Sequence, residues 1–254
     1  MSNILKLIET NNSSSNNINS EEHPLLGIRG GDALHVAINC SSMKQGGRSV
    51  ALVMFDYDGV IVDSLEVFTT RFSQACRENG FKEVNASEDV LGLFDGNVYE
   101  TMMRRGLKES TIDNILKRYE VLQAKQLANL ELFDGIGEAL KLISEKHEVY
   151  VITSNLSSAT IRVLNQNGIE CFKDVIGAEK EKSKIKKIMR TMSLHPGMPA
   201  YYVGDTKGDM IEGKRAGTQT IGVTWGWHTH DKLKEGSPDH LFNTPEELAD
   251  FLTK

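Results

Sequence analysis

Two carboxylates at the end of an apolar run are the residues of this chain best suited to chemistry. Asp56 and Asp58 follow residues 50–55, a run with the length and character of a buried parallel strand. While the chain stays extended, residues i and i+2 point to the same side, so both acids can face one small volume. Two anions in a poorly hydrated volume repel each other and are costly to hold. A bound divalent cation, a proton, or both would remove that cost, which indicates a chemical site.

A second acidic pair follows another strand-like run, residues 200–203. Asp205 and Asp209 lie within the segment 204–209, and their spacing puts them about one turn apart if a helix begins there. In an open parallel sheet, ligands gather beyond the carboxyl ends of the strands, where both acidic pairs are expected. Oxygen-only ligands suit Mg²⁺, which keeps several waters and shares its other positions with carboxylates and a substrate phosphate. The two pairs therefore predict a magnesium site.

Alternating strand and helix patterns predict the scaffold that positions these acids. After residue 132, apolar runs of strand length alternate with helical stripes, which is typical of a doubly wound (Rossmann-like) α/β fold with a parallel sheet core. Ser157 is expected to cap one helix and Gly168 to end it. Residues 244–247 carry the start signal of the last helix, with Pro at its first position. Residues 65–132 show helical spacing and no strand signal, which predicts a small inserted α-helical domain.

Composition limits the environment and the partners. The chain has 254 residues, a net charge of −6 at pH 7 and three cysteines that do not form metal-binding pairs. We expect no nucleic-acid partner, because phosphate binding leaves a basic surface, and no membrane partner, because no apolar stretch reaches the length of a span. Few cysteines favour a soluble, cytoplasmic protein. Residues 1–48, which are rich in Asn and Ser at 11–17, are expected to form a disordered or poorly ordered N-terminal extension.

Three ordered motifs resemble those of the haloacid dehalogenase-like (HAD) hydrolase superfamily. Residues 56–60, Asp-Tyr-Asp-Gly-Val, match its first motif, and Thr153 ends the next core strand as in its second. Residues 204–209 match its fourth motif, Gly-Asp-x-x-x-Asp. Residues 222–226, Gly-Val-Thr-Trp-Gly, look like the segment that phosphoglycolate phosphatase-like members carry after the fourth motif. The resemblance implies an α/β core made of residues 49–64 and 133–254. It also implies a helical cap of residues 65–132, which closes over the phosphate site and selects the leaving group.

The resemblance also implies a mechanism. Asp56 would attack phosphorus and form an aspartyl-phosphate. Asp58 would protonate the departing alcohol and then accept a proton from the hydrolytic water. The implied Mg²⁺ ligands are Asp56, the Asp58 backbone carbonyl and Asp205, with Asp209 supporting the metal less directly. The groups implied to bind the phosphate oxygens are Thr153, Lys182 and the backbone N–H groups near Ser154 and Asn155.

The lysine of the family's third motif has several candidates. The motif requires a lysine near the start of the helix before the fourth motif, and residues 177–188 contain many lysines. An apolar helical stripe over residues 185–192 places Lys182 at the start of that helix. We therefore predict Lys182, with Lys184 as the alternative, and expect at least three of the other lysines only to solvate a helix face.

The second aspartate of the first motif favours hydrolysis of a phosphate monoester. Within the superfamily that the chain resembles, dehalogenases have no acid–base aspartate at the position of Asp58, because no alcohol oxygen then needs a proton. The resemblance makes a small phosphorylated metabolite the expected substrate, with 2-phosphoglycolate first. A phosphomutase of the beta-phosphoglucomutase kind would also keep Asp58 and pass the phosphate to a sugar hydroxyl. A non-catalytic HAD-fold binding protein is a further alternative, although it would have no reason to retain a costly acidic cluster.

Overall fold

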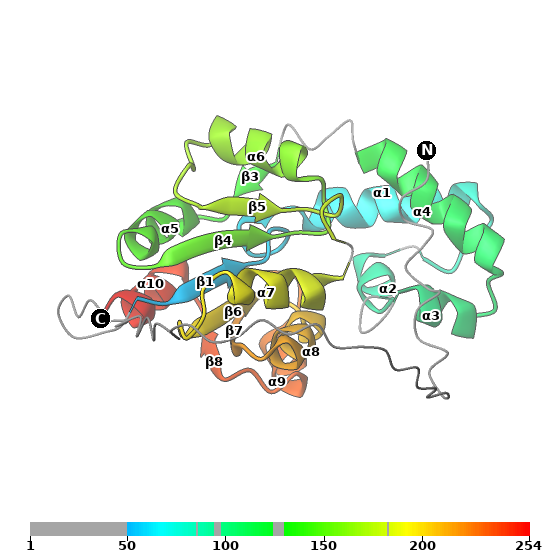
Figure 1. Ribbon diagram of the computed structural model, residues 1–254. Coiled ribbons are helices and arrows are strands. Elements are labelled where there is room, and N and C mark those ends of the chain that lie inside the picture. The colour runs from blue at the N-terminus through cyan, green and yellow to red at the C-terminus, as the bar shows by residue number, and fades with distance from the viewer. Residues whose placement is uncertain (1–49, 85, 94–97, 124–129, 182) are drawn as a thin grey trace, which may run out of the picture.

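A parallel sheet forms the core of the α/β part of the molecule, which lies on the left in Figure 1. The computed structural model describes residues 50–254 except 85, 94–97, 124–129 and 182. The expectation for residues 1–48 therefore concerns a segment outside the described residues. Within them, six parallel strands pair in the order β5-β4-β1-β6-β7-β8. Their bounds are β1 Leu52–Phe55, β4 Glu148–Ile152, β5 Asp174–Ile176, β6 Ala200–Gly204, β7 Gln219–Val223 and β8 His240–Phe242.

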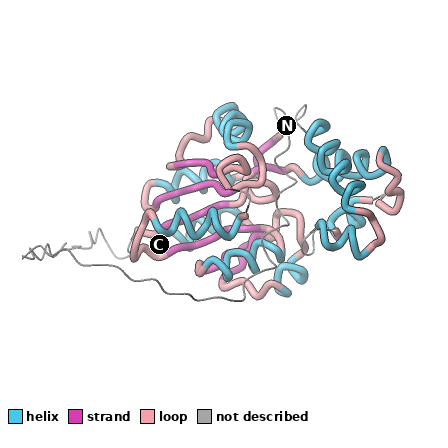
Figure 2. Tube along the Cα trace, turned by 45° about the vertical axis from the view of Figure 1, so that its right-hand side comes forward, coloured by secondary structure: helices cyan, strands magenta, loops and turns pink. Residues whose placement is uncertain are grey.

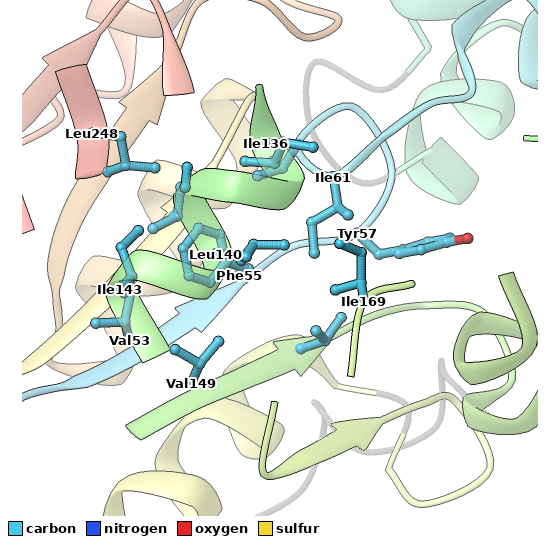
Figure 3. Packing of buried hydrophobic residues seen from close by; sticks show 14 of the residues in the cluster. Val53, Phe55, Tyr57, Ile61, Ile136, Leu140, Ile143, Val149, Ile169 and Leu248 are labelled. Carbon is cyan, nitrogen blue, oxygen red and sulfur yellow. The ribbon is translucent and has the colours of Figure 1, made fainter. Parts of the chain in front are cut away.

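Helices cover both faces of the sheet, because alternate residues of β1 point to opposite sides. Val53 and Phe55 pack with residues of α5, α6 and α10 (Figure 3). Leu52 and Met54 belong to a second cluster with residues of α7 and α8. All four side chains are fully buried, as expected for a parallel strand covered on both faces. The bounds of the helices beside the sheet are α5 Ile136–Ser144, α6 Ser157–Gln166, α7 Lys184–Ser193, α8 Lys207–Ala216, α9 His230–Glu235 and α10 Pro245–Thr253.

Among the described residues, four further helices form a second body beside the sheet (Figures 1 and 2). They are α1 Leu65–Glu78, α2 Ser87–Leu91, α3 Val98–Arg104 and α4 Glu109–Gln123. Their buried residues, among them Phe72, Met102 and Ile115, make a hydrophobic cluster of their own. The chain passes between the two bodies through an antiparallel ribbon of β2 (Val62–Asp63) and β3 (Glu131–Leu132). This arrangement confirms the predicted fold class, a doubly wound α/β core with an inserted helical cap.

Of the helix-end signals at α6 and α10, two hold and one is wrong. Gly168 follows α6 with φ 71°, and Thr244 caps α10 by accepting a hydrogen bond from the Glu247 N–H. Ser157, which was expected to cap α6, is instead its first residue. Its hydroxyl donates to the Val175 carbonyl and accepts from the Gly177 N–H, both at 2.9 Å. The side chain therefore fastens α6 to β5 and does not satisfy an N–H group of its own helix. In the described part of the chain, no helix has both the length and the apolar character of a membrane span.

Candidate active site

The central strands bring the acidic segments to one edge of the sheet. Phe55, the last residue of β1, pairs with Val151 of β4 and Val203 of β6. Asp56 follows β1 directly, and its N–H donates to the Val203 carbonyl at 2.9 Å. Thr153 and Asp205 directly follow β4 and β6, so they lie at the same edge. This is the edge at which open parallel sheets bind their ligands.

Asp56, Asp205 and Asp209 form a buried carboxylate cluster. One oxygen of each lies within 4.8 Å of those of the other two. The three residues are only 7%, 0% and 1% exposed, so water cannot screen their repulsion. The Lys184 ammonium lies 3.0 Å from Asp56 Oδ2 and 2.7 Å from Asp209 Oδ1. One positive charge cannot balance three carboxylates, so the cluster requires further positive charge.

The pKa values of the cluster reflect this imbalance. Burial alone would lower the pKa of Lys184, but the carboxylates of Asp209 and Asp56 raise it well above its ordinary value. Burial raises the pKa of Asp56 to about 7, although Lys184 opposes the shift. Burial, Asp209 and Asp56 together raise the pKa of Asp205 well above its ordinary value. Burial would also raise the pKa of Asp209, but Lys184 outweighs it and the pKa is lowered. Without another cation, the cluster therefore tends to hold a proton.

The donor set fits a divalent cation. Asp205 Oδ1 is buried and has no hydrogen-bond partner among the described residues, whereas Asp205 Oδ2 accepts the Trp227 N–H at 2.7 Å. An unpaired buried carboxylate oxygen is rare without a ligand. Asp56 offers a second carboxylate beside it. Oxygen donors of this kind suit Mg²⁺, as the sequence predicts.

Asp209 uses its oxygens differently. Its Oδ1 accepts hydrogen bonds from Lys184 and from the Tyr202 hydroxyl, the latter at 3.2 Å. Its Oδ2 accepts from the Thr206 N–H at 3.1 Å and from the Thr206 hydroxyl at 2.5 Å. Thr206 caps α8 and in return accepts the Asp209 N–H. Because both oxygens are already bonded, Asp209 is better placed to orient its neighbours than to hold a metal alone.

Two glycines allow the backbone to approach Asp205. Gly59 has φ 75°, and a Cβ atom there would lie 2.0 Å from Asp205 Oδ2. A Cβ atom at Gly226 would lie 2.2 Å from the Gly59 carbonyl oxygen and 2.4 Å from Asp205 Cβ. Any side chain at either position would displace Asp205.

Asp58 lies beside the cluster and has its own partner. Asn155 Nδ2 donates to Asp58 Oδ2 at 2.7 Å. Burial raises the pKa of Asp58, partly against hydrogen bonding and the charge of Lys184, so its carboxyl group can carry a proton. Thr153 Oγ1 accepts the Asn155 N–H at 3.0 Å, and Ser154 is exposed at the same turn. The structure thus brings Asp58, Thr153, Ser154 and Asn155 to one place.

The lysine in the cluster is Lys184, whereas Lys182 lies outside the described residues. Ser183 caps α7 by accepting the Lys186 N–H, which puts Lys184 in the first turn of the helix. Sequence reasoning did not single out Lys187, which is fully buried and donates to the Thr153 carbonyl. Burial lowers the pKa of Lys187 to about 8. Its three-residue spacing from Lys184, which puts both on one helix face, was the available signal.

A family model for haloacid dehalogenase-like hydrolases matches residues 53–223. The match covers β1 from its second residue, the aspartates that follow it, the helical insertion, and β4 and β6 with Thr153 and Asp205 at their ends. The chain therefore belongs to the haloacid dehalogenase-like hydrolase family, which confirms the resemblance seen in its motifs.

Named relatives and solved structures extend this finding. A phosphoglycolate phosphatase of Haemophilus influenzae is 25% identical and covers 79% of this chain and 97% of its own length. One from Vibrio vulnificus is 27% identical and covers 81% and 97%. Among solved structures, a haloacid dehalogenase-like hydrolase from Streptococcus pneumoniae has a TM-score of 0.67 at 24% identity and covers 80% and 98%. A predicted phosphoglycolate phosphatase from Haemophilus somnus has a TM-score of 0.64 at 19% identity and covers 80% and 97%. These solved structures show the same fold.

Proposed function

We propose that this chain is a Mg²⁺-dependent phosphatase that hydrolyses a small phosphate monoester through an aspartyl-phosphate on Asp56. The observation that supports it most is the buried cluster of Asp56, Asp205 and Asp209 around Lys184 at the carboxyl edge of the sheet. The relatives named above make 2-phosphoglycolate the first substrate to test.

The chain's own residues divide the work. Asp56 is the nucleophile, and its oxygen attacks phosphorus while the bond to the alcohol oxygen breaks. Lys184, the Thr153 hydroxyl and the backbone N–H of Ser154 hold the non-bridging oxygens, whose charge changes in the transition state. The Asn155 N–H is already bonded to Thr153 Oγ1 and orients that hydroxyl. Asp58 gives its proton to the leaving alcohol and then takes one from the attacking water.

The acidic cluster prepares the site for its metal. When bound, Mg²⁺ would neutralise and orient the phosphate. Asp56, Asp205 and the Asp58 backbone carbonyl would hold it, and Asp209 would keep Lys184 and the start of α8 in place. Burial of the carboxylates supports this assignment, since their pKa values favour a bound proton or cation over three free charges.

The helical body of α1–α4 is proposed as a cap of residues 65–132, on a core of residues 49–64 and 133–254. Phe68 of α1 stacks on Trp227 of the core with ring centroids 4.4 Å apart. The Trp227 N–H in turn bonds Asp205. A cap closed in this way would exclude water from the phosphate site and restrict the leaving group.

The test is phosphate release from a panel of phosphorylated metabolites with and without Mg²⁺. We expect Mg²⁺-dependent release from at least one small ester, and near-complete loss for Asp56→Asn with the fold intact by circular dichroism, because an amide cannot attack phosphorus. Conversion of a sugar 1-phosphate to its 6-phosphate without release would establish the phosphomutase alternative. Absence of any turnover by the folded wild type would favour a binding protein.

A further inference from the structure

We propose that Gln123 in the cap positions the carboxyl group of Asp58 through Asn155, so that cap closure sets the orientation of the acid–base group. This inference rests on the proposed function, because it assigns to Asp58 the protonation of the leaving alcohol. Gln123 is a positioning residue in this scheme and does not touch the substrate.

A short chain of hydrogen bonds joins the three side chains. Gln123 Nε2 donates to Asn155 Oδ1 at 2.9 Å, and Asn155 Nδ2 donates to Asp58 Oδ2 at 2.7 Å. Gln123 is the last residue of α4, Asn155 lies between β4 and α6, and Asp58 follows β1. The chain therefore runs from the cap, through the edge of the sheet, to the acidic site.

Asn155 is held by hydrogen bonds at its backbone N–H and at both ends of its side-chain amide. Its backbone N–H donates to Thr153 Oγ1 at 3.0 Å, which fixes the start of the side chain. Its amide has a donor end and an acceptor end, and Asp58 and Gln123 each use one. If the amide turned over, its oxygen would face the Asp58 carboxylate and its N–H₂ group would face the Gln123 N–H₂ group. Gln123 thus stabilises the one orientation in which Asn155 donates to Asp58.

These bonds fix the orientation of the Asp58 carboxyl group. Asn155 donates to Oδ2, which favours Oδ1 as the oxygen that carries the proton of the carboxyl group. The bond also restricts rotation of the carboxyl plane, which keeps Oδ1 at a fixed place in the site. Proton transfer to a leaving oxygen requires hydrogen-bond distance, and a misplacement of about 1 Å is enough to lower the rate strongly. The bond between Gln123 and Asn155 crosses from cap to core, so it forms only when α4 lies over the site.

A comparison of leaving groups tests the inference. An alkyl phosphate needs a proton on its leaving oxygen, whereas p-nitrophenyl phosphate releases a stable phenolate without one. The measured quantity is kcat/KM, which reports only the steps up to and including the first irreversible one. Here that step is transfer of the phosphate to Asp56, so hydrolysis of the aspartyl-phosphate does not contribute. For Gln123→Ala we expect a loss of about 10-fold to 100-fold on the alkyl ester, because general acid catalysis typically contributes at least that much. On p-nitrophenyl phosphate we expect a change of less than about 3-fold.

Two controls separate positioning from a general effect on the cap. Gln74→Ala removes another glutamine of the cap, whose amide donates to Glu78 on the surface of α1 at 2.9 Å. It should leave both substrates unchanged. A double-mutant cycle is the second control: if Gln123 acts through Asn155, then Gln123→Ala should have almost no effect on the alkyl ester in an Asn155→Ala background.

Equal losses of kcat/KM on both substrates, or additive effects of the two substitutions, would overturn the inference and leave the phosphatase proposal standing. A wild-type protein that is folded and hydrolyses neither ester nor any other member of the panel would overturn both. The two failures are therefore distinguishable.

Discussion

Among the described residues, Lys184 is the only lysine that forms ion pairs with the carboxylate cluster, through Asp56 and Asp209. We expect Lys184→Ala to lower kcat/KM by roughly 100-fold to 1000-fold, because a preorganised donor to the transition-state phosphate is lost. Lys186→Ala is the matched control, since Lys186 is exposed on the same helix. It should retain full activity. The comparison uses steady-state kinetics, on wild type and variants whose thermal unfolding midpoints are equal. Full activity in Lys184→Ala would leave Lys182 as the third-motif lysine.

Lys187 gives a prediction about stability and pH. Its pKa is about 8 in the folded chain against an ordinary 10.5, so between these values the unfolded chain binds more protons. Stability therefore rises with pH across this range. Relative to Lys187→Met, which cannot titrate, the wild type should gain up to about 3 kcal/mol between pH 7.5 and pH 10.5. Urea unfolding at several pH values measures it, and a constant difference would contradict the lowered pKa.

At the scale of residues, the aspartates were predictable and their partners were not. Strand ends fix where Asp56 and Asp205 lie, and their motif spacing predicts the chemistry that we propose for them. The lysine depended on where α7 begins, and an apolar stripe does not fix a helix start to within two residues. Ser183 was the neglected cap signal. The bond between Gln123 and Asn155 joins residues 32 positions apart across two bodies, so no local pattern announces it.

At the scale of elements, Thr206, the N-cap residue of α8, both stabilises its helix and bonds a carboxylate of the acidic cluster. Thr206 and Thr244 both accept the N–H of the third residue of their helices, so each Thr→Ala change should destabilise the fold by about 1 kcal/mol. Only Thr206 also bonds the carboxylate of Asp209. We therefore expect Thr206→Ala to lose a further factor of about 10 in apparent Mg²⁺ affinity, measured from the Mg²⁺ dependence of the rate.

Further substitutions separate the effect of Thr206 on stability from its effect on Mg²⁺ affinity. Thr206→Ser keeps the hydroxyl and should restore the Mg²⁺ dependence. Thr244→Ala should leave it unchanged, because α10 packs on the other face of the sheet. An equal loss of Mg²⁺ affinity in both alanine variants would show that the effect comes from general destabilisation.

The elements themselves were largely predictable. Apolar runs bounded by polar turns coincide with the strands β1, β4, β5, β6 and β7. Ser157 shows the limit of that approach. A serine at a helix start predicts a cap, but this hydroxyl bonds the Val175 carbonyl of β5 and the Gly177 N–H just after β5. That competition depends on tertiary packing, which the local sequence does not contain.

At the scale of the whole molecule, the described fold begins at the sheet. β1 starts at Leu52, and its residues are buried between β4 and β6. We expect a chain that starts at residue 49 to keep the thermal unfolding midpoint and kcat/KM of the full chain, because the family match begins at residue 53 and the first strand of the sheet begins at Leu52. Differential scanning calorimetry checks it. A midpoint lowered by several degrees would mean that this segment packs on the fold.

The ribbon of β2 and β3 makes the inserted helical domain easy to exchange for another. The chain leaves the sheet and returns to it at neighbouring positions, with Val62 paired to Leu132. The entropy of joining two fixed ends grows only slowly with the length of what lies between them. Grafts of other helical modules between Asp63 and Glu131 should therefore be tolerated by the sheet and its carboxylates. New substrate preferences can in this way be acquired by transplanting one contiguous piece of chain.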